Sequence, residues 1–284
     1  MENQFKKISV IIVTYQSGEI LVDCLNSVQR FFPNDEIIVV DNHPEDVDIK
    51  EYKTLFPNVY FISNPENSGF GGGNNFGADQ SQGDILFFLN PDTVIEEFDR
   101  AAVLKQFEKS EDSITGFPLF YPDGSFCKPL KYIPEIDFIL PKKLYGSLYK
   151  RIFSKDQRIS RRLYISGAAF MIKKKLFNEA DQFDQRYFLF FEENDLRSSL
   201  ILKKKYNPTV LSKGFKIIHH EGKSYNKNGI SWYADSLRLY ARKFGKKYLI
   251  PYKRFCVSLS LFIGNLRGKD GDSKRILLKE LKRD

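Results

Sequence analysis

The sequence predicts an α/β fold in which helices flank a central, mostly parallel β-sheet. The first 120 residues alternate short runs of β-branched and aromatic residues with helical patterns, as strand–helix–strand units do. Polar residues follow the ends of these runs, where open parallel sheets bind their ligands. The chain has 284 residues, 42% hydrophobic and 28% charged. This composition excludes a disordered chain or a membrane bundle and allows one large domain or two small ones.

The first half of the chain supplies the core of this predicted sheet. We expect a helix over residues 19–32 and strands over the following ranges: 8–15, 36–41, 59–63 and 85–90. The residues just after each run are the ones to inspect for a ligand site: 14–17, 41–43, 64–75 and 90–92.

The second half is less regular. Residues 127–160 carry three prolines and many Lys, Tyr and Leu, which predicts an insertion of loop or short helices outside the sheet. Strands are expected over residues 164–172 and 209–220, with a helix following Glu192. From residue 231 the apolar spacing is that of an amphipathic helix.

The formal charge of +8 is concentrated in two regions. Residues 238–284 carry 14 Lys/Arg against 4 Asp/Glu, and residues 128–175 carry 13 against 3. We find no zinc finger, no aromatic RNA-binding signature and no basic region followed by heptads, so nucleic acid is not an expected partner. The interleaved aromatic residues favour an anionic membrane surface or a phosphorylated partner. A solvated basic tail is the alternative.

Cysteine usage and the N-terminus favour a cytoplasmic location. The three cysteines, Cys24, Cys127 and Cys256, share no CxxC spacing, which argues against a disulfide framework or a zinc knuckle. Residues 1–7 lead into a strand run without the pattern of a signal peptide. The apolar stretch 255–266 is shorter than the roughly 20 residues that cross a bilayer, so it is expected at most to lie on the inner face of the membrane.

The first motif that could bind a ligand is glycine-rich. Residues 67–77 contain five glycines, which let a backbone approach a ligand closely. A helix starting near Asn74 would offer free N–H groups to a diphosphate or a ribose. A flexible surface loop is the alternative. A nicotinamide site is disfavoured because its glycines belong in the first strand–helix turn, whereas these follow the third strand.

A second motif, Asn-Pro-Asp-Thr at residues 90–93, follows an apolar strand run. The single carboxylate of Asp92 suits Mg²⁺ or Mn²⁺ if a substrate diphosphate and waters supply the other oxygens. A turn that merely ends the strand is the alternative.

Two further clusters contain titratable groups. Glu192, Glu193 and Asp195 lie beside aromatic residues, where crowding raises carboxyl pKa values and a general base becomes available. Acidic residues that cap a helix are the alternative. His219 and His220 end a strand, so their side chains point to opposite faces, and either could contact a metal or a diphosphate. Histidines with only a packing role are again the alternative.

In order, these motifs resemble the inverting family-2 glycosyltransferases with the GT-A nucleotide-diphospho-sugar transferase fold, most closely their rhamnosyltransferase-like branch. The resemblance covers residues 8–120 and 160–245. The matching segments are ISVIIVTY (8–15), VVDN (39–42), NSGF (67–70), GGNN (72–75), LNPD (89–92), SGA (166–168), FD (183–184), FEENDL (191–196) and HH (219–220).

The resemblance implies roles for individual residues. The nucleotide sugar would be bound by Thr14, Tyr15, Asp41, Asn42, Asn67, Gly69, Gly72, Asn74 and Asn90. A Mg²⁺ or Mn²⁺ ion would be held by Asp92, with His219 and His220 as further ligands. The base that deprotonates the acceptor hydroxyl would be Glu193, followed in preference by Asp195 and Glu192.

Two residues depart from the family pattern. Asn90 replaces the first acid of the metal-binding Asp-x-Asp motif, which leaves fewer protein ligands for the ion. Glu193 stands where the family usually has Asp, one methylene shorter.

The resemblance also implies an overall organisation and function. Residues 1–245 would form the GT-A domain, with residues 127–160 as a variable insertion on the acceptor side and residues 246–284 as a basic helical tail. The expected reaction is inverting transfer of rhamnose from dTDP-rhamnose to a lipid-linked or growing capsule or cell-wall polysaccharide. A galactosyl or glucosyl transferase using a UDP-hexose and a non-catalytic nucleotide-sugar-binding protein are the alternatives.

Overall fold

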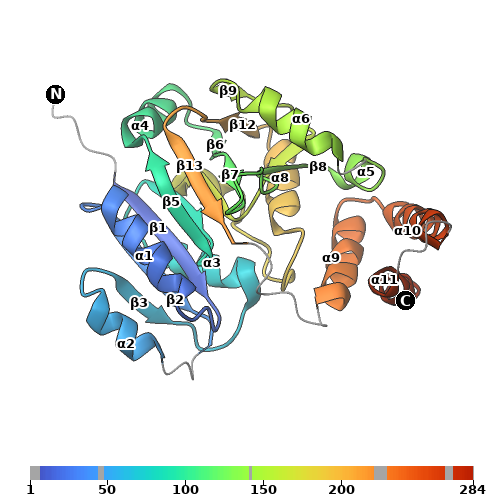
Figure 1. Ribbon diagram of the computed structural model, residues 1–284, viewed down its shortest axis with the longest axis horizontal. Coiled ribbons are helices and arrows are strands. Elements are labelled where there is room, and N and C mark those ends of the chain that lie inside the picture. Colours follow the sequence, from blue (N-terminus) through green and yellow to red (C-terminus); the bar gives the residue numbers. More distant parts are fainter. Residues whose placement is uncertain (1–6, 44–47, 141–142, 221–228, 266–270, 284) are drawn as a thin grey trace.

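The computed structural model describes residues 7–43, 48–140, 143–220, 229–265 and 271–283 (Figure 1). Its main sheet has eight strands in the order β3-β2-β1-β4-β11-β6-β12-β9. In that order their bounds are Tyr60–Ser63, Glu36–Asp41, Ile8–Thr14, Ile85–Leu89, Ala169–Lys173, Ser113–Gly116, Asn207–Val210 and Gln157–Arg158. The first four strands are parallel, and β11 runs antiparallel between β4 and β6. The predicted α/β fold with a central, mostly parallel sheet is confirmed.

Helices cover both faces of this sheet (Figure 1). The helices that precede the C-terminal region are α1 (Ile20–Phe31), α2 (Asp48–Leu55), α3 (Gly69–Gln80), α4 (Arg100–Lys109), α5 (Pro134–Asp137), α6 (Lys143–Ile152), α7 (Lys174–Glu179) and α8 (Glu192–Leu202). Val10 and Phe87 pack in one apolar cluster with α1, whereas their neighbours Ile11 and Phe88 pack in a second cluster with α3 and α8. Burial on both faces explains why the central strands are continuous apolar runs rather than alternating ones.

The strands predicted for the second half of the chain are wrong in their bounds, because two smaller sheets take up parts of them. One contains β5 (Thr93–Phe98), β13 (Phe215–His219) and β7 (Leu119–Phe120), and the other pairs β10 (Leu163–Ile165) with β8 (Leu130–Tyr132). The strand expected over 164–172 is therefore two strands, β10 and β11, and that expected over 209–220 is β12 and β13. In each case the chain leaves one sheet and enters another. Gly214, with a φ of +75°, lies in the second break.

The region 127–160 lies only partly outside the main sheet, so that prediction is wrong in one respect. Its last strand, β9, pairs antiparallel with β12 and forms an edge of the main sheet. Its helix α6 buries Tyr149, whose hydroxyl donates to the Leu130 carbonyl at 2.6 Å. These contacts fix the region against the sheet.

Three helices form the C-terminal end: α9 (Gly229–Lys243), α10 (Leu249–Asn265) and α11 (Asp272–Glu280). Figure 1 shows α10 and α11 beyond α9, away from the sheet. Leu249 and Leu281 are buried in a third apolar cluster together with Leu237 and Tyr240 of α9. This cluster continues to Tyr187 and Phe191, so α9 connects the two terminal helices to the segment that precedes α8.

Candidate active site

The turn between β4 and β5 brings Asp92 next to His219 and His220. β5 pairs antiparallel with β13, and this register sets Thr93 opposite His219. The Nε2 atom of His219 lies 3.2 Å from Oδ1 of Asp92, and the backbone N–H of His220 donates to the Asp92 carbonyl at 2.9 Å. Strand pairing therefore joins two motifs that are far apart in the sequence.

The Asp92–His219 pair fits two ligand positions of a divalent cation. Oδ1 of Asp92 is buried and lies 3.2 Å from Nε2 of His219, with which it forms an ion pair when the histidine is protonated, and no other described residue donates a hydrogen bond to it. Adjacent ligands of an octahedral ion with bonds of about 2.1 Å are separated by roughly 3 Å. Within the described ranges, no three or more His, Cys, Asp or Glu side chains group around a common metal position. Substrate oxygens and water would have to complete the coordination.

His219 is held between two groups. Burial disfavours its charged form, but the contacts with Asp92 and Cys127 outweigh burial and raise the pKa of His219 to about 9. The Sγ atom of Cys127 is 3.3 Å from Nδ1 of His219. His219 therefore carries a proton at neutral pH, and a cation bound at Nε2 would have to displace it.

The acidic cluster stands at the start of α8, after an unusual backbone. Phe190 and Phe191 both have positive φ values, 74° and 72°, which bulky residues rarely adopt. The carbonyl of Phe191 accepts the backbone N–H of Asp195 at 2.8 Å, in the first turn of the helix. This left-handed pair sets the residue at which α8 begins, and strained backbone of this kind clusters at functional sites.

The three carboxylates of the cluster have different environments. Glu192 is only 2% exposed, and burial together with the neighbouring Glu193 raises the pKa of Glu192 well above its ordinary value. Asp195 is equally buried and accepts hydrogen bonds from the Tyr187 hydroxyl at 3.0 Å and from Lys243 at 2.8 Å. Glu193 is half-buried and is the most accessible of the three.

Consecutive residues connect Glu193 to the Asp92 turn. The Gly167 N–H donates to Oε1 of Glu193 at 2.8 Å, and the Ala168 carbonyl accepts the Asn90 N–H at 2.9 Å. A Cβ atom on Gly167 would lie 2.7 Å from that same Glu193 oxygen and 3.0 Å from the Phe70 ring, so a larger residue would push the Glu193 carboxylate out of this position. The β10–β11 connection thus holds the acidic helix and the Asn-Pro-Asp turn at one end of the sheet.

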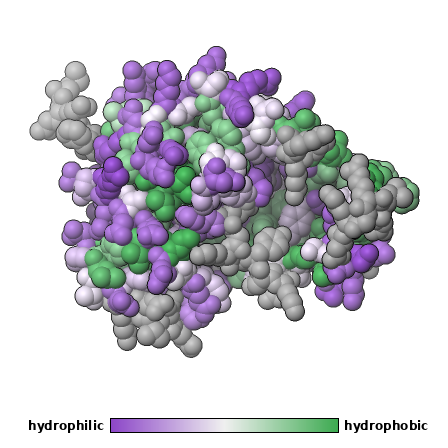
Figure 2. Space-filling view, viewed as in Figure 1, coloured by the Kyte–Doolittle hydropathy of each residue, from purple (hydrophilic) through white to green (hydrophobic). Residues whose placement is uncertain are grey.

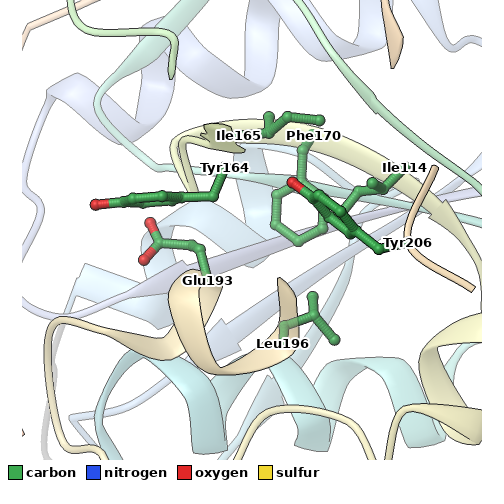
Figure 3. Close-up of a pocket in the computed structure, with 7 residues that line it drawn as sticks. All are labelled: Ile114, Tyr164, Ile165, Phe170, Glu193, Leu196 and Tyr206. Atoms are coloured by element: carbon green, nitrogen blue, oxygen red, sulfur yellow. The ribbon is translucent and has the colours of Figure 1, made fainter. Parts of the chain in front are cut away.

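Tyr164 is a neighbour of the acidic cluster that the sequence does not predict. Figure 3 shows its ring beside the Glu193 carboxylate. Burial, and then the charge of Glu193, raise the pKa of Tyr164 well above its ordinary value. A cavity of about 10 Å³ adjoins the pair, with room for about one water and not for a sugar. Tyr164 lies in a short apolar strand, and no sequence signal separates it from a core tyrosine.

Four of the residues predicted to bind the nucleotide sugar lie at the carboxyl ends of β1 and β2: Thr14, Tyr15, Asp41 and Asn42. The Thr14 hydroxyl donates to Ser17 Oγ at 2.8 Å, and an Asp41 carboxylate oxygen accepts the His43 N–H at 2.8 Å. Tyr15 is 51% exposed, and its ring meets the His43 ring edge-on with centroids 5.3 Å apart. His43 was not assigned from the sequence, although it directly follows Asp41 and Asn42. The exposed Tyr15 ring and the partly buried His43 ring form a corner suited to a flat base.

The glycine-rich segment differs from its prediction, because α3 begins at Gly69 and not near Asn74. The N–H of Gly69 donates to the Asn67 side chain at 3.1 Å, and the N–H of Phe70 donates to the Phe188 carbonyl at 3.1 Å. These two donors at the helix start are therefore used within the protein, where free donors for a diphosphate were expected.

Several residues of this segment serve the packing of α3. A Cβ atom on Gly73 would lie 2.7 Å from Val13, and one on Gly72 would lie 2.5 Å from Cβ of Ser68. Buried Asn74 donates to the Phe70 carbonyl at 2.9 Å. Asn42, also buried, donates from its amide to the Gly69 carbonyl at 2.8 Å and so joins the end of β2 to the start of α3. The glycines let the helix lie close to β1.

Together, the fold and this end of the sheet define a glycosyltransferase with the GT-A fold. The chain belongs to glycosyl transferase family 2, since the model of that family matches residues 9–180, more than half of its length.

Similar proteins are active on several sugars. GalNAc(5)-diNAcBac-PP-undecaprenol beta-1,3-glucosyltransferase of Campylobacter jejuni is 24% identical over 288 residues, covering 90% of this chain and 89% of the relative. Rhamnosyltransferase WbbL of Escherichia coli K12 is 24% identical over 250 residues, covering 82% and 92%. The crystal structure of GalNAc-T7 with UDP, GalNAc and Mn²⁺ aligns with a TM-score of 0.61 at 16% identity. It covers 84% of this chain, which spans 48% of that one, and it supports the fold alone.

Proposed function

We propose that this glycosyltransferase moves a sugar from a nucleoside diphosphate to a hydroxyl of a lipid-linked or growing glycan, with inversion at the anomeric carbon. The observation that supports the proposal most is the pair of backbone hydrogen bonds through Gly167 and Ala168. They tie the Glu193 carboxylate and the Asn90–Asp92 turn to adjacent residues. A base and a diphosphate-binding turn held this close can act on one substrate pair.

Glu193 is the proposed general base. Its carboxylate is half-buried, and a hydrogen bond from the Gly167 N–H orients it. It would take the proton of the acceptor hydroxyl while that oxygen attacks the anomeric carbon from the face opposite the diphosphate, which inverts the configuration. Burial of Glu192 and the ion pair of Asp195 with Lys243 argue against either of these acids as the base.

Asp92 and His219 are the residues proposed to hold Mg²⁺ or Mn²⁺, and His220 adjoins them through its backbone. A divalent cation bound there would neutralise charge on the leaving nucleoside diphosphate. Asn90 stands where a second acid would add a ligand, so tight binding of the ion is expected only together with the donor. The exposed ring of Tyr15 and the adjoining, partly buried ring of His43 are proposed to contact the base of the nucleotide.

The donor is proposed to be dTDP-rhamnose, with a UDP-hexose as the second candidate. The Asn-Pro-Asp form of the turn and the similarity to a rhamnosyltransferase support rhamnose. The Campylobacter jejuni relative, named as a glucosyltransferase, supports the UDP-hexose.

The lipid-linked acceptor and a membrane contact rest on two observations. The Campylobacter jejuni relative is named for a PP-undecaprenol-linked acceptor. The α10 helix presents Phe255 and Phe262 at 65% and 63% exposure within the basic C-terminal region. None of the helices in the described part of the chain is long and apolar enough to cross a bilayer. We therefore propose a peripheral contact of this region with the inner face of the membrane, with acceptor choice in residues 127–160.

The test uses a panel of nucleotide sugars, with transfer and donor hydrolysis both measured in the presence of Mn²⁺. We expect Glu193→Gln to slow transfer by about 10²–10⁴-fold while donor binding is retained. Asp92→Asn is expected to weaken donor binding in the presence of Mn²⁺. Glu108→Gln makes the same chemical change on the exposed face of α4 and should leave both properties unchanged.

Two results would contradict the proposal. Transfer that survives both Glu193→Gln and Asp92→Asn would remove the assigned base and the assigned metal ligand. Binding of a nucleotide sugar by the unaltered protein, with neither transfer nor hydrolysis for any donor, would favour the non-catalytic binding protein.

A further inference from the structure

We propose that Cys127 is a positioning residue that holds the His219 imidazole in the tautomer able to bind a cation. The inference rests on the proposed metal site and adds a residue to it that the resemblance to family 2 does not supply. The observation that supports this role is the contact between Cys127 Sγ and His219 Nδ1, which are 3.3 Å apart.

The fold fixes Cys127 independently of His219. Its backbone N–H donates to the Leu119 carbonyl of β7 at 2.8 Å, next to an antiparallel bridge between Phe120 and Phe126. β7 is parallel to β13, the strand that ends with His219. The cysteine is 2% exposed, so the thiol is confined to the Nδ1 side of the ring while Asp92 lies on the Nε2 side.

The protonation chemistry of imidazole explains why a partner at Nδ1 matters for a cation at Nε2. A neutral histidine carries one proton, so an Nε2 atom that binds a cation requires the proton on Nδ1. That buried Nδ1–H needs an acceptor, and the sulfur of Cys127 is positioned to be one. When both nitrogens are protonated, Nδ1 still donates to the same sulfur. Cys127 thus stabilises the orientation of the ring in both states.

Loss of such a partner of a metal-binding histidine typically lowers metal affinity by about 10–100-fold. Sulfur is a weak acceptor, so we expect the lower end of that range. A serine hydroxyl can also accept the Nδ1–H, whereas alanine and valine cannot. The conservative change should therefore restore affinity that the apolar changes remove.

Cys24 offers a matched control. It is fully buried, and its Sγ lies 3.7 Å from the Asn90 carbonyl and 3.9 Å from Thr93 Oγ1, close to the same turn. Its thiol contacts the turn and not His219. Cys24→Ala therefore removes a buried thiol near the site without removing the Nδ1 partner.

The first experiment measures Mn²⁺ affinity from the spin-resonance signal of the free ion, in the presence of UDP or dTDP. We expect Cys127→Ala to weaken Mn²⁺ binding roughly tenfold, and Cys127→Ser and Cys24→Ala to stay within about twofold of the unaltered protein. Cys127→Val fills the space without an acceptor and tests the same point if the alanine variant folds poorly.

A second readout reports the tautomer directly. Long-range ¹H–¹⁵N correlations of His219, recorded with Mg²⁺ and UDP, should show a proton on Nδ1 in the unaltered protein and in Cys127→Ser. In Cys127→Ala, at a Mg²⁺ concentration that saturates only the unaltered protein, we expect the signal of this tautomer to weaken. A cysteine that only packed would leave it unchanged.

His219→Ala distinguishes a failure of the proposed metal site from a failure of the role of Cys127. If it weakens Mn²⁺ binding and Cys127→Ala does not, the role of Cys127 is wrong and the metal site stands. If His219→Ala has no effect on Mn²⁺ binding, the proposed metal site and the role of Cys127 fail together. Equal losses in Cys127→Ala and Cys24→Ala would indicate a general loss of packing and would also overturn the inference.

Discussion

Glu192 and Glu193 are adjacent in the sequence and differ in almost every physical respect. Glu193 is half-buried and accepts the Gly167 N–H, whereas Glu192 is buried and its Oε1 lacks a hydrogen-bond partner among the described residues. A neutral carboxyl tolerates such a position better than a charged one. This contrast makes the stability of the protein dependent on pH.

The sign of that dependence follows from the raised pKa of Glu192, above the ordinary value of 4.5. The folded state holds the proton at pH values where the unfolded state has released it, so the stability from this group is present below about pH 4.5 and is lost as pH rises above it. Glu192→Gln should therefore unfold at a higher temperature than the unaltered protein at pH 8, by roughly 2–4 °C for each kcal/mol regained. At pH 4 the two should coincide. Thermal unfolding between pH 4 and pH 8 measures the gap, and parallel curves would contradict the prediction.

The acidic cluster was predictable from the sequence, but the different environments of its members were not. Three carboxylates within four positions beside aromatic residues indicate a crowded acidic site. Their separate environments depend on Lys243, Gly167 and Tyr187, which come from other elements of the fold. Local spacing contains no information about these contacts.

At the scale of single elements, α10 has an apolar surface that no described residue covers. Phe255, Leu259, Phe262 and Ile263 are all exposed, and their spacing sets them on one face of the helix. Figure 2 shows apolar surface at the end of the molecule where Figure 1 has α10. Basic residues of the same region would complement anionic lipid.

We expect the double change Phe255→Ser and Phe262→Ser to lower sedimentation with anionic vesicles by tenfold or more. Burial of a phenylalanine side chain contributes about 1.5–3 kcal/mol, so losing two weakens partitioning strongly. Transfer to a short soluble acceptor should persist. Leu55→Ser on α2 removes a comparably exposed apolar side chain and serves as the control. Unchanged vesicle binding of the double variant, or equal loss of binding and soluble transfer, would contradict a docking role.

Sequence patterns predicted some elements well and others poorly, for a physical reason. The strand expected over residues 36–41 has the bounds of β2, because a continuous buried run has only one way to fit a parallel sheet. The glycine-rich segment was expected to be a loop until Asn74, since glycine disfavours helices. Close packing against Val13 and Ile11 makes those glycines necessary and overrides the local preference.

At the scale of the whole molecule, Lys243 joins the C-terminal helices to the acidic site. Its ammonium group contacts the carboxylates of Asp184 and Asp195, both at 2.8 Å. Around this ion pair, Tyr187 and Phe191 pack with residues of α9. The orientation of α9 and the environment of α8 therefore depend on each other.

Removing the lysine should destabilise the whole fold. Lys243→Met leaves the buried Asp195 carboxylate without its cation. Because the lysine side chain is itself 28% exposed, we expect a cost of about 1–3 kcal/mol, less than for a fully buried pair. The double change Lys243→Met with Asp195→Asn should recover part of that loss. Urea unfolding measures both variants, with Lys247→Met as an exposed lysine control. A double variant no more stable than Lys243→Met would contradict the pairing.

The left-handed backbone of Phe190 and Phe191 determines which side chain of α8 faces the Gly167 N–H. Neighbouring side chains on a helix are separated by about 100° of rotation. Deleting one residue ahead of α8 would therefore turn Glu193 away from the Gly167 N–H and bring a different neighbour toward it, either buried Glu192 or Asn194, which has no carboxylate. The segment before α8 should therefore tolerate substitutions far better than insertions or deletions. A homologue whose segment differs in length there could keep this fold while losing the carboxylate at the position of Glu193.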